Sequence, residues 1–477
     1  MLFNSIEFLL FLPATFIVYW FVLKRNLKAQ NIFLLGASYF FYGWWDYRFL
    51  ALIGISTLID YFIGLALGKE DHAKKRKLLV AISVTVNIGI LGFFKYYNFF
   101  VDSWINAWAD LGVEMHAWTL QIILPVGISF YTFQTLSYTF DIYRKKLQPT
   151  RNFINFAAFV AFFPQLVAGP IERASNLLPQ FSVKRVFNFE RAKSGLHLII
   201  WGLFKKVVIA DSCATYVNTI FENYQDVNSL TLLLGVIYFG FQIYGDFSGY
   251  TDIAIGTARL FGFELTRNFN YPYFSRDIAE FWRRWHITLF SWFKDYLYIP
   301  LGGSRGGKTK QIRNVFIIFL VSGFWHGANW TIIIWSGLHA VFFLPLLLSK
   351  RNRKHLNQVA ENGSIPSFRE FAQIITTFSL VTLAWVFFRS ENLSMAMDYY
   401  KRMFLDLNFS VELLLIERYS VEMLLIIGIF ILIEWFHRRK EHPISGRYKW
   451  LKLAAIVAMI LTLGVYTENQ QFIYFQF

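Results

Sequence analysis

The sequence has almost no cysteine: Cys213 is the single one in 477 residues. A lone cysteine forms no internal disulfide and supplies no cysteine-rich metal site. Charged residues are also scarce, at 16% of the chain, whereas ordinary soluble domains carry about 25%. The GxGxxG dinucleotide fingerprint and the HExxH zinc motif are both missing. We therefore expect no metal site and no bound cofactor.

More than half of the residues in the sequence are hydrophobic. Hydrophobic residues make up 56% of the sequence and aromatic residues 20%, with 54 phenylalanines. This composition is typical of a membrane protein, in which phenylalanine suits lipid-facing and helix-packing surfaces. The net charge of +15 does not indicate nucleic-acid binding, because the basic residues lie in short loops between apolar stretches.

About twelve apolar stretches are candidates for transmembrane helices, each of which needs roughly 20 residues. They are residues 5–23, 30–44, 48–67, 78–94, 119–140, 195–211, 229–245, 314–328, 330–348, 373–388, 421–436 and 452–467. Three further stretches, 153–168, 249–263 and 285–300, are broken by proline, glycine or charge. We interpret these three as re-entrant or interfacial. The sequence therefore predicts an all-α integral membrane protein.

The basic clusters predict the orientation, because cytoplasmic loops carry an excess of lysine and arginine. The clusters lie at 24–28, 69–77, 144–151, 173–193, 267–284, 305–313, 350–354 and 437–452. All of them fall on the cytoplasmic side if both termini lie outside. No linker rich in proline, glycine or serine divides the chain and no internal repeat is evident, so we expect one polytopic domain over residues 1–477.

His326 is the strongest candidate for chemistry. It ends an apolar stretch and is surrounded by Ser322, Gly323, Trp325 and Asn329. A histidine at membrane depth is costly, titrates near neutral pH and can accept a proton from a hydroxyl. The alternative is a core histidine whose hydrogen bonds a neighbouring hydroxyl satisfies.

His286 is the second candidate. It follows Arg283 by three residues, so a continuous helix would carry both on one face. The alternative is an interfacial helix whose arginines contact the phosphates of membrane lipids. Farther along the chain, His339 is expected to pack against, or hydrogen-bond to, a neighbour.

Polar residues also cluster in an apolar context at 244–256, where Asp246, Ser248, Thr251 and Asp252 occur together. An ion site of a transporter is one interpretation of this cluster. A re-entrant turn whose backbone groups are satisfied by these side chains is the other, and we favour it.

Four segments, 162–173, 241–256, 267–303 and 322–340, closely resemble the bacterial membrane-bound O-acyltransferase family. The nearest branch is the membrane subunit of alginate O-acetylation, and the teichoic acid D-alanyl transfer proteins are more distant. The resemblance implies helices around a tunnel between the two membrane faces, with a core at about 1–350 and further spans and a tail at 373–477. It matches His326 to the essential histidine of the family and His286 to its second polar position.

The implied reaction is acyl transfer, with acetyl-CoA or another cytoplasmic thioester as donor. A hydroxyl acceptor would enter from outside, His326 would act as general base, and His286 or Asn329 would polarise the thioester carbonyl. We expect Asn329, Trp325, Ser322 and Arg283 to bind substrate or donor. The expected product is an O-acylated exported or cell-surface polysaccharide, made in the bacterial inner membrane with a periplasmic or extracellular esterase-like partner of the SGNH type.

The C-terminal tail, TENQQFIYFQF, has two interpretations. Its aromatic residues can anchor it at the outer membrane interface, which we favour. Alternatively the tail folds back into the tunnel, and Tyr474 relays the acyl group to the partner.

Other functions stay open at this point. Lipid-directed or D-alanyl-type transfer are the enzymatic alternatives. An ion-coupled exporter or a non-catalytic scaffold of an export machine are the non-enzymatic ones.

Overall fold

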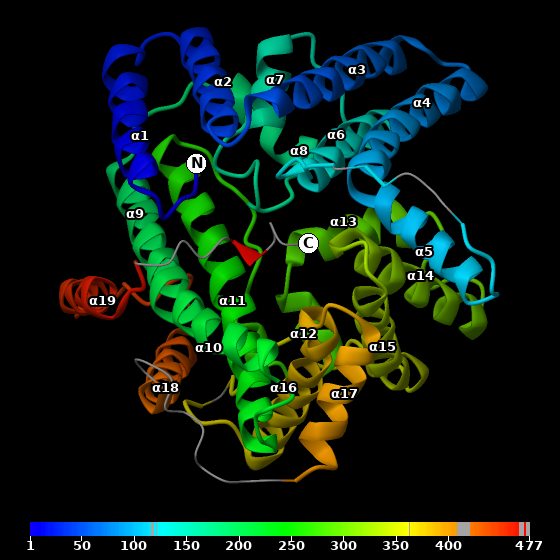
Figure 1. Ribbon diagram of the computed structural model, residues 1–477. Coiled ribbons are helices and arrows are strands. Elements are labelled where there is room, and N and C mark those ends of the chain that lie inside the picture. Colours follow the sequence, from blue (N-terminus) through cyan, green and yellow to red (C-terminus); the bar gives the residue numbers. More distant parts are fainter. Residues whose placement is uncertain (116–118, 121, 362, 408–419, 467–471, 474–477) are drawn as a thin grey trace. The chain divides into compact units, whose positions relative to one another are not determined.

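Every regular element in the described part of the chain is a helix (Figure 1). The computed structural model describes residues 1–115, 119–120, 122–361, 363–407, 420–466 and 472–473. In a bilayer the backbone must satisfy its hydrogen bonds internally, and a helix does so within one segment. The prediction of an all-α membrane protein is confirmed.

Five helical segments within the described residues are long and apolar enough to cross a membrane. They are Tyr47–Lys69, Ala73–Ala109, Ser229–Leu260, Trp330–Leu348 and Phe368–Arg389. A sixth apolar helix, Ile6–Val22, is shorter. The predicted count of about twelve is therefore not confirmed, since several candidate stretches form helices with charged or short apolar parts. The stretch 195–211 illustrates this, because Lys205, Lys206 and Asp211 lie within it.

The chain divides into two compact units. The first contains Met1–Leu196 and Ala254–Thr266, and the second contains His197–Ile253 and Arg267–Phe477. Two long helices, α9 (Phe189–Leu203) and α11 (Ser229–Leu260), contribute residues to both. Two of the three boundaries fall inside these helices, and the third, between Thr266 and Arg267, lies in an irregular segment.

The first unit packs its helices around α3. Its α-helices are α1 (Ile6–Ile17), α2 (Leu27–Gly43), α3 (Leu50–Lys69), α4 (Ala73–Leu91), α5 (Tyr97–Ala109), α6 (Ile128–Tyr143), α7 (Phe153–Ala161) and α8 (Ala174–Leu177). Helix α3 packs against α4, α6 and α7. At its centre the fully buried Asp60 accepts hydrogen bonds from Ser83 (2.5 Å), Asn87 (2.7 Å) and Thr139 (3.0 Å). These bonds satisfy a carboxylate that would be costly to bury alone.

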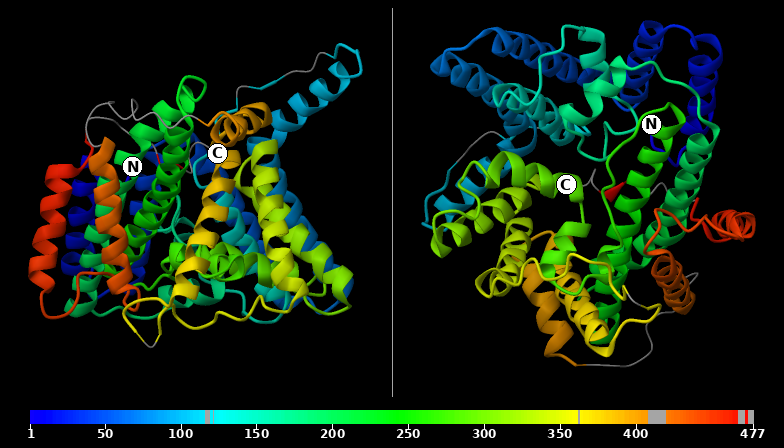
Figure 2. Two further views of the ribbon diagram at one scale, coloured as in Figure 1. Left: turned by 90° about the horizontal axis from the view of Figure 1, so that it is seen from below. Right: turned by 180° about the vertical axis from the view of Figure 1, so that it is seen from behind.

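The second unit holds both candidate histidines. Besides parts of α9 and α11 it contains the π-helix η5 (Phe204–Ala210), α10 (Asp211–Glu222), α12 (Ile278–Arg284), α13 (Ile287–Phe293), the π-helix η7 (Lys294–Tyr298), α14 (Lys308–His326), α15 (Trp330–Leu348), α16 (Phe368–Arg389), α17 (Leu393–Phe404), α18 (Ser420–His437) and α19 (Lys449–Leu463). Helices α14 and α15 run side by side (Figure 2). Their close approach depends on Gly323, since a side chain there would meet Ser336 of α15.

The interpretation of 249–263 as a re-entrant stretch was wrong. Residues 244–256 lie inside α11, which continues without a break to Leu260. The carboxylates tolerated in this helix are paired with lysines of η5: Lys206 lies 2.7 Å from Asp246, and Lys205 lies 2.7 Å from Asp252. Paired buried charges do not require the backbone to unwind, and these ion pairs also account for the cluster without an ion site.

Candidate active site

His286 sits at the corner between α12 and α13 with a left-handed backbone, φ 46°. The helix breaks here, so the prediction that Arg283 and His286 share one helical face was wrong. Arg283 instead donates hydrogen bonds to the backbone carbonyls of Asn352 (2.8 Å) and His355 (2.7 Å). The corner turns the imidazole into the interior, where it is fully buried.

Asn268 holds the imidazole of His286. The Oδ1 of Asn268 lies 3.1 Å from Nδ1 of His286, and it also accepts the backbone N–H (3.1 Å) and the hydroxyl (2.9 Å) of Thr288. The Thr288 N–H can only donate, which identifies this atom of Asn268 as the oxygen. Nδ1 of His286 therefore carries the proton, and Nε2 presents its lone pair.

Burial lowers the pKa of His286 well below its ordinary value, and the neighbouring His326 lowers it further. His286 lies outside the helices long enough to span a membrane. A neutral imidazole with its lone pair on Nε2 accepts a hydrogen bond or a proton. Polarising a thioester carbonyl through Nε2, as one hypothesis above required, would need a proton on that nitrogen, and this tautomer carries its proton on Nδ1.

His326 is the last residue of α14 and is 3% exposed. Its ring centroid lies 6.2 Å from that of His286, so the two histidines predicted from sequence are neighbours. Aromatic rings of Trp325 (4.9 Å), Trp335 (5.5 Å) and Phe388 (6.1 Å) surround it. Two imidazoles in an aromatic enclosure form a site from which bulk water is excluded.

Of the other predicted contacts of His326, Asn329 is hydrogen-bonded within the protein. Asn329 caps α15: its side chain accepts the N–H of Thr331 (2.9 Å) and donates to the carbonyl of Glu391 (2.9 Å). Ser322 is buried on α14 near the contact with α15. Roles of Asn329, Ser322, Trp325 and Arg283 toward a substrate stay predictions; the cap bonds of Asn329 use one of its two amide N–H groups.

His339 forms a hydrogen bond with a neighbour, as predicted. Its Nδ1 accepts the indole N–H of Trp282 at 3.3 Å. Trp335 packs between this pair and the catalytic candidates, with its ring 5.1 Å from His339 and 5.5 Å from His326. Trp282, His339 and Trp335 thus form an aromatic wall next to His326.

A cavity of about 650 Å³ opens on the other side of this wall. Its inner surface is apolar, with Trp282, Phe290 and Phe319 among the lining residues. All of its charged lining residues are cations: Arg283, Lys294 and Arg353. The cavity therefore suits a long ligand with an anionic end.

The rim of the same cavity includes Ser304, which belongs to a glycine-rich loop. Four glycines of this loop, 302, 303, 306 and 307, have positive φ, and α14 begins directly after it at Lys308. Residues 302–309, GGSRGGKT, have the spacing of a phosphate-binding loop. They follow the π-helix η7 and not a strand, so the loop is not part of a nucleotide-binding βα unit.

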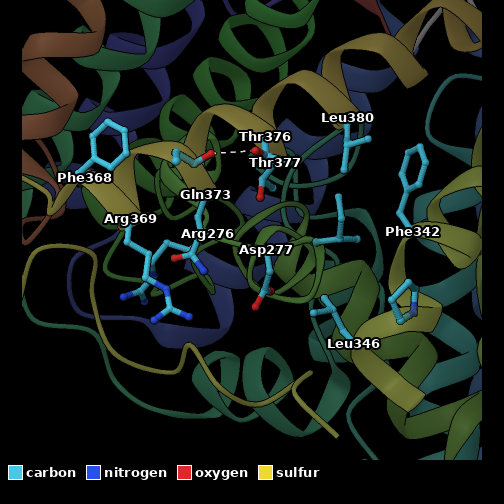
Figure 3. Close-up of a pocket in the computed structure, with 13 residues that line it drawn as sticks. Arg276, Asp277, Phe342, Leu346, Phe368, Arg369, Gln373, Thr376, Thr377 and Leu380 are labelled. Atoms are coloured by element: carbon cyan, nitrogen blue, oxygen red, sulfur yellow. Dashed lines mark hydrogen bonds between the residues drawn. The ribbon is translucent and has the colours of Figure 1, made fainter. Parts of the chain in front are cut away.

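A second groove, of about 540 Å³, lies between the N-terminal parts of α12 and α16 and the C-terminal part of α15. Figure 3 shows the guanidinium groups of Arg276 and Arg369 at one end and Phe342, Leu346 and Leu380 at the other. Unlike the first cavity, it also contains a carboxylate, Asp277. Arg276 is itself bound by Glu280 (3.0 Å) and Glu370 (3.2 Å).

The described part of the tail packs inside the second unit. Phe472 and Ile473 are each 2% exposed, so the interpretation as an interfacial anchor was wrong for these two residues. Phe472 packs on Tyr250 and Phe247 of α11. Tyr474, the candidate relay, lies outside the described residues.

Sequence reasoning missed Asn268 and Trp335. Asn268 lies in an irregular segment in which no periodicity marks a buried residue, and its importance follows from the turn at His286. Trp335 lies within an apolar helix, where it resembles any other core aromatic. The aromatic richness of 322–340 was the one signal that could have indicated a lined site.

These features define a helical membrane protein with two buried histidines beside a cavity for an anionic, partly apolar ligand. The sequence model of MBOAT, the membrane-bound O-acyltransferase family, matches residues 81–362. The chain belongs to this family, as the resemblance predicted, and its enzymatic class is membrane O-acyltransferase.

Curated relatives cover most of the chain. It is 40% identical over 406 residues to "Probable alginate O-acetylase AlgI" of Azotobacter vinelandii, which covers 85% of this chain and 78% of the relative. It is 37% identical to "Peptidoglycan O-acetyltransferase" of Helicobacter pylori, over 84% of this chain and 80% of the relative. The similarity to "Teichoic acid D-alanyltransferase" of Bacillus subtilis is lower, 28% over 57% of this chain and 70% of the relative.

Proposed function

We propose that this enzyme transfers an acetyl group from a cytoplasmic thioester donor, such as acetyl-CoA, across the inner membrane for O-acylation of an exported or cell-surface polysaccharide. The pair of buried imidazoles, 6.2 Å apart between ring centroids, is the observation that carries the proposal. The names of two relatives of the chain, an alginate O-acetylase and a peptidoglycan O-acetyltransferase, support acetyl as the group and a polysaccharide as the acceptor.

The cavity behind Trp282 supports a thioester donor that carries phosphate groups. Its cations Lys294 and Arg353 suit phosphates, and the first turn of α14 adds backbone N–H groups that favour anions. The apolar surface formed by Trp282, Phe290 and Phe319 suits the thin arm that carries the acyl group. The basic loops 305–313 and 350–354 next to this mouth indicate the cytoplasmic side.

The reaction balances with the residues of this chain. The acceptor oxygen attacks the thioester carbonyl carbon, its proton passes to a histidine, and the carbon–sulfur bond breaks. The proton then returns to the departing thiolate, which leaves as a thiol. We assign the base to His326 from its match to the WHG motif of the family. General-base assistance of this kind contributes roughly 10²–10⁴-fold.

His286 acts through the lone pair of Nε2, because the hydrogen bond to Asn268 places the proton of the imidazole on Nδ1. In this arrangement it accepts a hydrogen bond from the acceptor hydroxyl or from protonated His326, and so stabilises the charge that develops during proton transfer. The aromatic enclosure keeps water from hydrolysing the thioester.

On the outer side we propose that Tyr474 accepts the acyl group and passes it to an extracellular partner of the SGNH type, which acylates the polymer. A phenyl ester is a more activated donor than an alkyl ester because phenolate leaves more readily. The inward packing of Phe472 supports a tail directed to the interior.

Purified chain in proteoliposomes, supplied with radiolabelled acetyl-CoA inside and polysaccharide plus partner outside, tests the proposal. We expect label in the polymer with the unaltered chain and none with His326→Ala, while His72→Ala, an exposed position, serves as a control. Equal labelling by His326→Ala would contradict the assignment. Labelling from a D-alanyl carrier but not from acetyl-CoA would instead favour the function named for the more distant relative.

A further inference from the structure

The carboxylate of Asp246 binds two groups from different parts of the second unit. Its Oδ1 lies 2.7 Å from the Nζ of Lys206 in η5. Its Oδ2 accepts the backbone N–H of Ile473, in the C-terminal segment, at 2.6 Å. The side chain is 2% exposed, so both interactions are shielded from water.

The C-terminal segment makes further contacts with the same two elements. Beyond the end of α19, the N–H of Val465 donates to the carbonyl of Val207 in η5 at 3.0 Å. Farther along, the ring of Phe472 lies 4.7 Å from Tyr250 and 6.0 Å from Phe247, both on α11. The described parts of the segment therefore lie along η5 and α11. At Asp246, a side chain of α11 binds the backbone of the segment.

This docking place adjoins the catalytic candidates. Phe247, the residue after Asp246, packs edge-on against His286 with 4.7 Å between ring centroids. Thus one ring, Phe247, separates the buried Phe472 from the imidazole of His286.

We propose that Asp246 is a positioning residue that docks the C-terminal segment against α11 beside His286, with Lys206 holding the carboxylate in place. The hydrogen bond joins Asp246 to the N–H of one particular residue, Ile473. It therefore fixes which residue of the segment lies beside Asp246 as well as where the segment lies. A shift of one residue would place a different N–H at Asp246 and move Phe472 away from Tyr250.

The network around Asp246 permits a selective variant. An amide has one acceptor oxygen, whereas Asp246 uses both of its oxygens. In Asp246→Asn one of the two donors, Lys206 or Ile473, must face an NH₂ group. Lys206 keeps a second carboxylate, that of Asp211 at 2.8 Å, so no buried cation loses all of its partners.

The chain offers a matched control. Asp252 is also a carboxylate of α11 paired with a lysine of η5, Lys205, at 2.7 Å, and Lys205 also donates to Ser248 at 2.9 Å. In Asp252→Asn the amide oxygen can still accept from Lys205. The ion pair between Asp252 and Lys205 involves no atom of the C-terminal segment.

Amide hydrogen exchange of the full chain in lipid nanodiscs tests the docking directly. We expect the Ile473 amide to be protected in the unaltered chain and in Asp252→Asn, and to exchange about tenfold faster or more in Asp246→Asn, as loss of a charge-assisted bond would produce. Unchanged protection in Asp246→Asn would overturn the proposal. Ile473→Pro, which removes the N–H and leaves the buried ion pairs intact, provides a second variant should Asp246→Asn fail to fold; because it has no amide at position 473, its readout is the transfer assay described below.

The consequence for catalysis rests on the proposed function and has its own readout. We expect Asp246→Asn and Ile473→Pro to lower transfer to the polymer about tenfold, with hydrolysis of the acetyl thioester in the absence of polymer unchanged. Full transfer by a variant whose Ile473 amide is unprotected would overturn the positioning role. If the unaltered chain itself transfers no acetyl group, the proposed function fails, while the exchange measurement still decides the docking.

Discussion

Asn268 donates no hydrogen bond to His286: it accepts one, through the oxygen that also binds Thr288. This relationship fixes which nitrogen of His286 carries the proton. It leaves the NH₂ group of Asn268 buried and, among the described residues, without a hydrogen-bond partner. A buried donor next to a candidate base is a place for a substrate oxygen.

The first prediction concerns this asparagine. In Asn268→Asp the acceptor toward His286 is kept and a negative charge is added, which stabilises the imidazolium and raises the pKa of His286. His286 can accept a hydrogen bond through Nε2 only in its neutral form, so the acidic limb of the pH–rate profile should move to higher pH. The measurement is acetyl transfer across pH 5–9. An unshifted profile would contradict the role of His286 as a hydrogen-bond acceptor in its neutral form.

The second prediction concerns the corner at His286. Asparagine tolerates a left-handed backbone better than alanine and can donate to Asn268 as the imidazole does. His286→Asn should therefore keep the thermal stability of the chain and lose activity moderately, whereas His286→Ala should lose nearly all activity. Thermal unfolding and acetyl transfer are measured together. If asparagine proves as damaging to activity as alanine while the fold is intact, His286 takes up a proton in the reaction.

The third prediction concerns the cationic cavity. Reversing the charge of Lys294 or Arg353 to glutamate should raise KM for acetyl-CoA about tenfold with little change in kcat, because these side chains would contact the donor away from the reacting carbon. Arg369→Glu, in the other groove, is the matched control and should leave KM unchanged. Equal increases of KM in Arg353→Glu and Arg369→Glu would show that KM responds to the overall charge of the protein and not to a contact within the first cavity.

The fourth prediction concerns the tail. Tyr474→Phe removes one hydroxyl and keeps the aromatic ring. We expect loss of polymer acylation, with donor hydrolysis unchanged. Full acylation by this variant would eliminate the relay and leave direct transfer from the thioester to the acceptor.

The fifth prediction concerns orientation. In a Cys213→Ser background, a cysteine in place of Lys308 should react only with reagent supplied to the cytoplasmic side, and one in place of Gln225, an exposed residue after α10, only with reagent outside. The test is labelling of intact cells and of inverted vesicles with a membrane-impermeant maleimide. Reaction of position 308 from outside would reverse the donor side.

The helical membrane class and the pair of histidines could be predicted from sequence, because apolar length and an ionisable residue in an apolar context are local properties. The partners of those histidines could not. Asn268 reaches His286 only because the chain turns at a left-handed residue, and no sequence pattern encodes that turn. Asp246 and Asp252 indicated a break in a helix, since the lysines that pair with them lie 40 and 47 positions earlier in the chain.

The chemistry of single residues and the family match both pointed to His326 and His286, which the structure places together. Asn329, expected to contact a substrate beside His326, caps a helix. A polar residue beside a candidate base is as often a structural cap as a substrate contact. Only the hydrogen-bond partners distinguish the two.

The wide turn of η5 has a consequence for how this sequence can change over time. A π-helical turn holds one more residue than the α-helical turn that would replace it, and Lys205 and Lys206 both lie in it. Deleting any one residue between Phe204 and Ala210 would restore the tighter winding, shorten the stretch by one residue and change the directions in which Lys205 and Lys206 point. Both lysines could not then meet their carboxylates on α11, so this stretch should accept substitutions far more readily than changes in length.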